Sequence, residues 1–147
     1  GFAAFDTPAG RLGMLLCYDK LFPEAARALA LDGAEILCSL SAWPVDRQRP
    51  ARRIREDRQT LHFDLCDRAR AIENQVFLIA PNQTGEAPPQ FDSYGHSSIV
   101  DPWGDLLAVA PELRGGALKV RILTHALPLP AGQGVWLPRA RRLFWLE

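Results

Sequence analysis

Cys17 is the residue of this 147-residue chain whose surroundings best suit chemistry. It directly follows an apolar run, Leu12 to Leu16, that predicts a buried strand. After a short gap, Phe22-Pro23-Glu24 predicts the start of a helix, because proline favours the first helical turn and a carboxylate favours the positive helix end. The spacing therefore predicts a thiol on a sharp strand-to-helix turn, beside backbone N–H groups. That arrangement suits a nucleophile, although a cysteine packed as a small hydrophobe also fits the strand position.

Further motifs surround and follow the cysteine in a fixed order. They are Cys17-Tyr18-Asp19, Phe22-Pro23-Glu24, Gly33-Ala34-Glu35, Ser41-Ala42-Trp43-Pro44, Arg70-Ala71-Ile72-Glu73-Asn74, Ala80-Pro81-Asn82-Gln83 and Gly95-His96-Ser97-Ser98-Ile99-Val100-Asp101-Pro102-Trp103-Gly104. The ordered set resembles the nitrilase (carbon–nitrogen hydrolase) superfamily over about Phe5 to Ala110. The turn carries Cys-Tyr-Asp, where true nitrilases usually carry Cys-Trp-Glu, and this difference indicates cleavage of amides or N-carbamoyl compounds.

The resemblance implies an α/β fold that forms part of a four-layer α-β-β-α sandwich. It also implies that Cys17 is the nucleophile, that a thioester forms, and that the backbone N–H of Tyr18 binds the oxyanion. Neither a cofactor nor a metal is implied. Trp43 and Asn82 are candidate substrate-binding residues, because each follows a strand at the edge where α/β sites gather. A buried aromatic plug for Trp43 and a turn-forming role for Asn82 remain open alternatives.

The same resemblance implies that essential parts of the site are absent from residues 1–147. Family members use a Glu–Lys–Cys triad whose Glu and Lys precede the cysteine, whereas none of the sixteen residues before Cys17 is Glu or Lys. Lys20 lies in the variable pair before Phe-Pro-Glu and is not assigned the lysine's role. Residues 1–147 are therefore expected to be a single incomplete domain, the C-terminal portion, with 124–147 as an extended tail. Activity should need an upstream segment; the alternative is a truncated, non-catalytic homologue that acts as a binding or assembly subunit.

The charge composition does not favour a nucleic-acid partner. Seventeen basic residues balance seventeen acidic ones, so the chain carries no net positive charge that would attract a polyanion. Three cysteines without paired spacing favour a reducing, cytoplasmic setting, and no apolar run suits a membrane helix. The arginine-rich segment between Arg47 and Arg58 is better explained as a loop that faces solvent or another subunit than as an RNA-binding site. Gly95-His96-Ser97-Ser98-Ile99 lacks the final glycine of a serine-nucleophile motif.

The apolar patterns predict an alternation of strands and helices. Strands are expected at 2–5, 12–17, 34–40, 76–80, 96–100, 106–110 and 117–123, and helices at 23–31 and 58–74. The second helix is expected to be amphipathic, with an apolar face, because Leu61, Leu65, Ala69 and Ile72 recur at helical spacing. Residues 85–93 are expected to be a loop. Without an upstream half, one apolar face of the sheet would lack its cover, so we expect a homo-oligomer or an N-terminal partner segment beside the small-molecule substrate.

Overall fold

The computed structural model describes residues 1–45, 51–53, 56–87, 91–110, 125–126 and 142–143. Its helices are η1 (Cys17–Leu21, a 3₁₀ turn), α1 (Pro23–Leu31) and α2 (Arg58–Asn74). Its strands are β1 (Phe5–Thr7), β2 (Gly10–Leu16), β3 (Ile36–Leu40), β4 (Phe77–Ala80), β5 (Thr84–Ala87), β6 (Phe91–Tyr94), β7 (Ser98–Val100), β8 (Leu106–Val109), β9 (His125–Ala126) and β10 (Arg142–Leu143).

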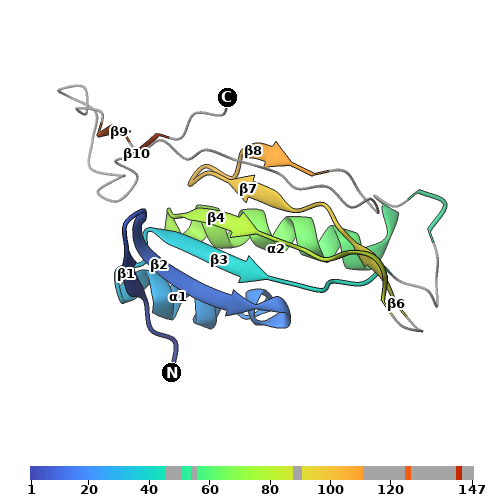
Figure 1. Cartoon of the computed structure of the whole chain (residues 1–147), viewed down its shortest axis with the longest axis horizontal. Coiled ribbons are helices and arrows are strands. Elements are labelled where there is room, and N and C mark those ends of the chain that lie inside the picture. The colour runs from blue at the N-terminus through green and yellow to red at the C-terminus, as the bar shows by residue number, and fades with distance from the viewer. Residues whose placement is uncertain (46–50, 54–55, 88–90, 111–124, 127–141, 144–147) are drawn as a thin grey trace.

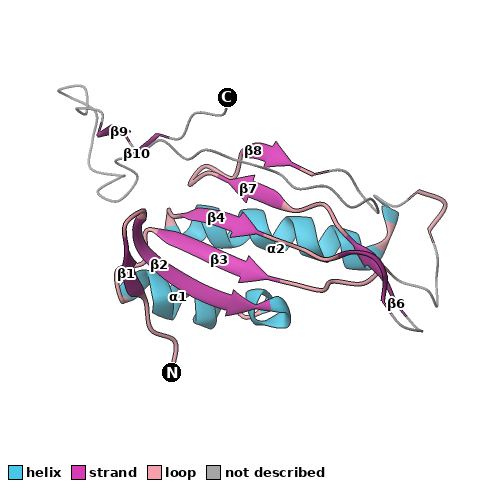
Figure 2. Ribbon diagram, viewed as in Figure 1, coloured by secondary structure: helices cyan, strands magenta, loops and turns pink. Residues whose placement is uncertain are grey.

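Six strands form one mixed sheet in the order β1-β2-β3-β4-β7-β8. Strands β2, β3 and β4 are parallel, and the pairs β1–β2, β4–β7 and β7–β8 are antiparallel. The parallel strands are the apolar runs that the sequence predicts to be buried, as expected where a crossover helix follows each strand. The predicted α/β fold is confirmed (Figures 1 and 2).

Both helices lie against the same face of this sheet (Figure 1). Helix α1 begins with Pro23 in its first turn, as the sequence predicts, and the left-handed Gly33 (φ 93°) follows its cap. Helix α2 begins at the cap Asp57, whose carboxylate accepts hydrogen bonds from the backbone N–H groups of Gln59 and Thr60. It ends at Gln75, which adopts a left-handed conformation (φ 53°). The predicted bounds of both helices are confirmed.

The buried face of α2 is not the one that periodicity predicts. Leu61, Leu65 and Ile72 are 53%, 59% and 48% exposed. The face turned to the sheet and to α1 instead carries Thr60, Phe63, Asp67, Arg70, Ala71 and Asn74. Burial of this stripe is tolerable because its charged members find partners in η1, and paired charges can be buried where isolated ones cannot. The predicted apolar face of this helix is therefore wrong.

Two further predictions are corrected. The strand predicted at 2–5 lies instead at Phe5–Thr7, because the turn takes up only Pro8 and Ala9 and leaves Thr7 to pair with Gly10. Residues 85–93, expected to be a loop, contribute to a hairpin of β5 and β6, in which Thr84 pairs with Tyr94. The predicted strand at 117–123 and nearly all of the predicted tail at 124–147 lie outside the described residues.

The second face of the sheet is open over the described part of the chain. Met14, Leu16 and Leu40 point away from the helices and are 41%, 70% and 39% exposed. The opposite side chains of the same strands, such as Leu15 and Leu37, are buried in the core. Exposed apolar side chains within a sheet are typical of a face that packs against another layer. The face that carries Met14, Leu16 and Leu40 is therefore suited to contact a further segment or chain.

Candidate active site

The predicted site residues meet at one edge of the sheet. Because β2, β3 and β4 run in parallel, their carboxyl ends lie at the same edge, where ligands bind in open α/β sheets. Cys17 follows β2, Trp43 lies just beyond β3, and Asn82 lies just beyond β4. The segments after β3 and β4 are joined by a parallel bridge between Ser41 and Asn82. The structure thus brings the four predicted site residues, Tyr18 included, to one edge.

Cys17 lies on the turn that the sequence predicts. It opens η1 directly after β2 and has φ 48°, in the left-handed region that a non-glycine residue enters at a cost of about 1–2 kcal/mol. Such a conformation persists only where the surroundings hold it. Asp19 supplies one constraint, because its carboxylate accepts a hydrogen bond from the backbone N–H of Leu16 at 3.0 Å. Asp19 therefore helps to close the turn that carries Cys17.

Trp43 joins the turn to the loops beyond β3 and β4. Its ring stacks on that of Tyr18, with centroids 5.9 Å apart and planes 10° apart, and it is only 2% exposed. Its backbone N–H donates to Oδ1 of Asn82 at 2.8 Å, and its indole N–H donates to the backbone oxygen of Gln59 at 2.8 Å. The side-chain amide of Asn82 donates to the backbone oxygen of Gly95 at 2.7 Å. Protein contacts therefore engage the polar groups of both residues; whether either touches substrate stays a prediction.

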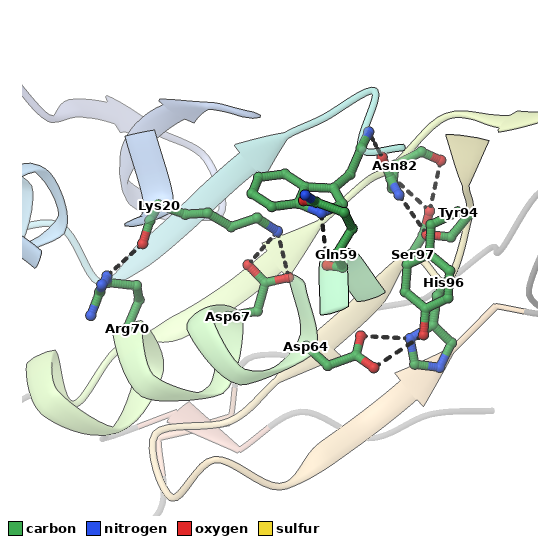
Figure 3. Close-up of polar contacts among 11 residues, drawn as sticks. Lys20, Gln59, Asp64, Asp67, Arg70, Asn82, Tyr94, His96 and Ser97 are labelled. Atoms are coloured by element: carbon green, nitrogen blue, oxygen red, sulfur yellow. Dashed lines mark hydrogen bonds and ion pairs between the residues drawn. The ribbon is translucent and has the colours of Figure 1, made fainter. Parts of the chain in front are cut away.

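A buried ion pair that the sequence motifs do not predict lies beneath the turn. The ammonium of Lys20 donates to both carboxylate oxygens of Asp67, at 2.9 and 2.8 Å, and both side chains are almost fully buried (Figure 3). The same ammonium lies 3.2 Å from the ring centroid of Phe63 and 5.2 Å from that of Trp43. Because the ammonium is enclosed by a carboxylate and two rings, Lys20 does not present its charge at the surface of the site.

Burial shifts both partners of this pair towards their neutral forms. Desolvation lowers the pKa of Lys20, and the nearby Asp67 carboxylate only partly offsets this. Desolvation raises the pKa of Asp67 to about 6, against the opposing effect of the Lys20 ammonium. The pair therefore costs desolvation energy that its own attraction does not fully return.

Arg70 forms a second connection between α2 and the turn. Its Nε donates to the backbone oxygen of Lys20 at 2.7 Å, and its Nη2 donates to that of Leu21 at 3.1 Å (Figure 3). Its Nη1 pairs with Glu73 at 2.8 Å. The turn after Cys17 is thus held by α2 through one side chain and two carbonyl oxygens. The signal for this was the polar stripe at helical spacing along α2, which the apolar periodicity on the other side obscured.

A third polar group lies near the amino end of β7. Nδ1 of His96 is 2.8 Å from Oδ1 of Asp64, and the hydroxyl of Tyr94 donates to Oδ2 of the same carboxylate at 3.1 Å (Figure 3). His96 has φ 58°. Its neighbour Ser97, the centre of the apparent serine motif, donates through its hydroxyl to the backbone oxygen of Asn82. This hydrogen bond holds the loop after β4 in place. A strand follows Ser97, whereas a helix would follow the serine of a nucleophile motif.

The other two cysteines lie within regular secondary structure. Cys38 lies within β3 and Cys66 within α2, and burial raises the pKa of both thiols. All three cysteines are free. In the part of the chain that the structure describes, no three His, Cys, Asp or Glu side chains gather as a metal site would require, and no helix is long and apolar enough to cross a membrane.

The family model described as carbon-nitrogen hydrolase matches residues 1–133. The chain belongs to the carbon–nitrogen hydrolase family, within the nitrilase superfamily. Among its relatives, the human protein named deaminated glutathione amidase is 43% identical over 107 residues, which are 73% of this chain and 29% of that protein. The Caenorhabditis elegans nitrilase and fragile histidine triad fusion protein NitFhit is 41% identical over 107 residues, 73% of this chain and 22% of that protein.

Solved structures of the family have the same fold. A carbon–nitrogen hydrolase from Helicobacter pylori G27 superposes with a TM-score of 0.66 at 34% identity, over 75% of this chain and 39% of that one. The C. elegans NitFhit structure gives a TM-score of 0.64 at 40% identity, over 75% of this chain and 24% of that one. This family member therefore spans less than half the length of these relatives. The predicted family resemblance is confirmed.

Proposed function

We propose that this carbon–nitrogen hydrolase is an amidase in which Cys17 is the nucleophile. The observation that carries the proposal is the left-handed Cys17 on the turn after β2, at the edge where three parallel strands end. Family membership supports C–N hydrolysis. The name of the human relative, deaminated glutathione amidase, favours a carboxamide over an N-carbamoyl substrate.

In the proposed reaction, Sγ of Cys17 attacks the carbonyl carbon of the amide. The backbone N–H of Tyr18 donates to the resulting oxyanion. The C–N bond then breaks, the amine or ammonia leaves with a proton, and a thioester remains on Sγ. Water attacks the thioester, which releases the acid and restores the thiol. One oxyanion donor is worth about 10²–10³ in rate, so a single N–H accounts for part of the stabilisation that such an intermediate needs.

The remaining groups are proposed to come from an upstream segment. The family resemblance implies a Glu that acts as base and a Lys that completes the oxyanion site, and both would precede Cys17. General acid–base catalysis contributes about 10²–10⁴, so residues 1–147 alone should be nearly inactive. The apolar side chains Met14, Leu16 and Leu40 on the open sheet face support a packing partner there. That partner would be an N-terminal segment or a second copy of the chain.

The substrate is proposed to lie over the Tyr18–Trp43 stack. Tyr18 and Phe22 are 59% and 54% exposed and meet edge to face at 5.9 Å, so an apolar surface adjoins Cys17. Contact of Trp43 or Asn82 with substrate remains part of this proposal, as does a cytoplasmic location.

The proposal is tested with the complete gene product and a panel of substrates. The panel contains deaminated glutathione, simple aliphatic amides and N-carbamoyl amino acids, and ammonia or amine release is measured. We expect hydrolysis of at least one amide. Cys17→Ser should lower kcat by at least about 10³-fold, whereas Cys38→Ala should not. Wild-type inactivity on the whole panel would refute the enzymatic proposal and favour a non-catalytic subunit.

A further inference from the structure

We propose that Lys20 and Asp67 act as one positioning unit for Cys17, and that the reactivity of this thiol depends on the two side chains being paired. The inference rests on the proposed function of Cys17 and extends it to two residues that the family resemblance does not assign. Lys20 and Asp67 are positioning residues: they act on the reaction through the turn that carries Cys17.

The ion pair joins the turn of Cys17 to helix α2. Lys20 is the fourth residue of the 3₁₀ turn that Cys17 opens, so its backbone belongs to the segment that sets the left-handed conformation of Cys17. Asp67 lies on α2, a separate and rigid element, and both of its carboxylate oxygens accept hydrogen bonds from the Lys20 ammonium. A side chain anchored at both ends transmits the position of α2 to the turn. The Arg70 contacts to the carbonyl oxygens of Lys20 and Leu21 act at the same point.

A gain in stability does not explain the Lys20–Asp67 pair. Both partners are buried, and burial shifts each pKa towards the neutral form. Replacement of a buried ion pair by apolar side chains of similar volume is often neutral or stabilising, whereas loss of one partner is strongly destabilising. What the pair supplies is directional: two charge-assisted hydrogen bonds fix the ammonium in one place.

Several charged and titratable groups surround the pair. Besides desolvation and Asp67, the thiols of Cys66 on α2 and Cys17 on the same turn act on Lys20, and both raise its pKa. Besides desolvation, the Lys20 ammonium and His96 near β7 lower the pKa of Asp67, whereas Asp64 on α2 raises it. The pKa of Asp67, about 6, is within reach of mildly acidic solution. As the pH falls through that value, Asp67 takes up a proton, its attraction for the ammonium weakens, and the turn loses its anchor.

The test compares the two single variants with an apolar double variant. Lys20→Met and Asp67→Asn each unpair one partner, and Lys20→Met with Asp67→Leu replaces both. The measurements in the complete gene product are kcat, KM, and the rate of Cys17 alkylation by iodoacetamide, normalised to the alkylation of Cys38 in the same sample. Cys38 lies on β3 and belongs to no part of the pair.

We expect each single variant to lower kcat and normalised Cys17 alkylation by about 10- to 100-fold, with KM changed less than twofold, because misplacement of a reacting group by about 1 Å costs up to about 10² in rate. The double variant should fold better than the single variants but keep most of this loss, because it removes the unpaired charge and also the two directional hydrogen bonds that hold the turn. A double variant with wild-type values would overturn the proposal, as would folded single variants with wild-type values. If Asp67→Asn fails to fold, Lys20→Met and the double variant decide between these outcomes.

The pH profile gives a readout that a purely structural role would not move. The ratio of wild-type to double-variant values, for kcat and for normalised alkylation, should fall as the pH drops from 7 to 5, with its midpoint near 6. A flat ratio would contradict the proposal. If wild type hydrolyses no substrate, the proposed function fails, yet the alkylation ratios still decide whether Lys20 and Asp67 position Cys17.

Discussion

Two neighbouring parts of the site edge are held in place by different chemistry. The turn after β2 is held from α2 by charged groups, Lys20–Asp67 and Arg70. The loops after β3 and β4 are held by neutral hydrogen bonds, from the backbone of Trp43 to Asn82 and from Asn82 to Gly95. Neutral bonds fix a loop at any ordinary pH, whereas a buried ion pair fixes a turn only while both partners are ionised. The part that carries Cys17 is therefore the pH-sensitive one.

Trp43 belongs to both parts, so its removal should have the largest effect. It stacks on Tyr18, meets Phe63 edge to face, and is almost fully buried. Trp43→Ala should lower the free energy of unfolding by about 3–5 kcal/mol, measured by denaturant titration. Phe22→Ala, at a residue 54% exposed, should cost less than about 1 kcal/mol and serves as its control. Equal losses in the two variants would show that Trp43 does not join the parts.

Asn82→Leu and Arg70→Met each weaken one of the two parts, so their effects on Cys17 can be compared. Each change unpairs buried backbone groups, at about 2–3 kcal/mol in the free energy of unfolding. We expect only Arg70→Met to slow the alkylation of Cys17 by iodoacetamide, because Arg70 holds the turn through Lys20 and Leu21. Gln83→Ala, at an exposed neighbour of Asn82, is the control. If Asn82→Leu slowed alkylation as much, the two parts would not be independent.

Stability should depend on pH through Asp67 in the direction opposite to activity. Its pKa in the folded protein, about 6, lies above its ordinary 3.8, so between these values the folded protein holds a proton that the unfolded chain has released. This contribution to stability is fully present below pH 3.8 and is lost as the pH rises through about 6. Urea unfolding from pH 4 to pH 7 should show a shallower decline, or a steeper rise, in Asp67→Asn than in wild type. An identical slope in both proteins would contradict the assignment.

The smallest expected effect concerns a second left-handed residue. Gln75, with φ 53°, ends α2 far from any chemistry, and its backbone N–H caps the helix through the oxygens of Ala71 and Ile72. Gln75→Gly should raise the free energy of unfolding by about 0.5–1 kcal/mol, since glycine adopts this conformation without strain. It should leave kcat unchanged. Leu65→Gly, at an exposed position within α2, should instead cost about 1 kcal/mol.

The sequence predicted the elements well and their contacts poorly. Helix bounds at Pro23, Leu31, Arg58 and Asn74 follow from caps and periodicity, which are local signals. The orientation of α2 does not follow from local signals. The side of the helix with Asp67 and Arg70 can be buried because its charged side chains bind Lys20 and Leu21, which are distant in sequence. Lys20 illustrates the same limit. Its motif marks it as a variable position, and its contact with Asp67 becomes visible only in the folded structure, where α2 packs against the turn. The β5–β6 hairpin was missed because Pro88-Pro89 is typical of a loop.

Trapping the thioester on Cys17 tests the proposed nucleophile without reference to any other residue. The complete gene product is mixed with its best amide, quenched in acid within milliseconds, digested and analysed by mass spectrometry. We expect an acyl adduct on the Cys17 peptide that appears before the free acid and is absent from Cys17→Ser. Rapid turnover with the adduct on another residue, or undiminished hydrolysis by Cys17→Ser, would contradict it.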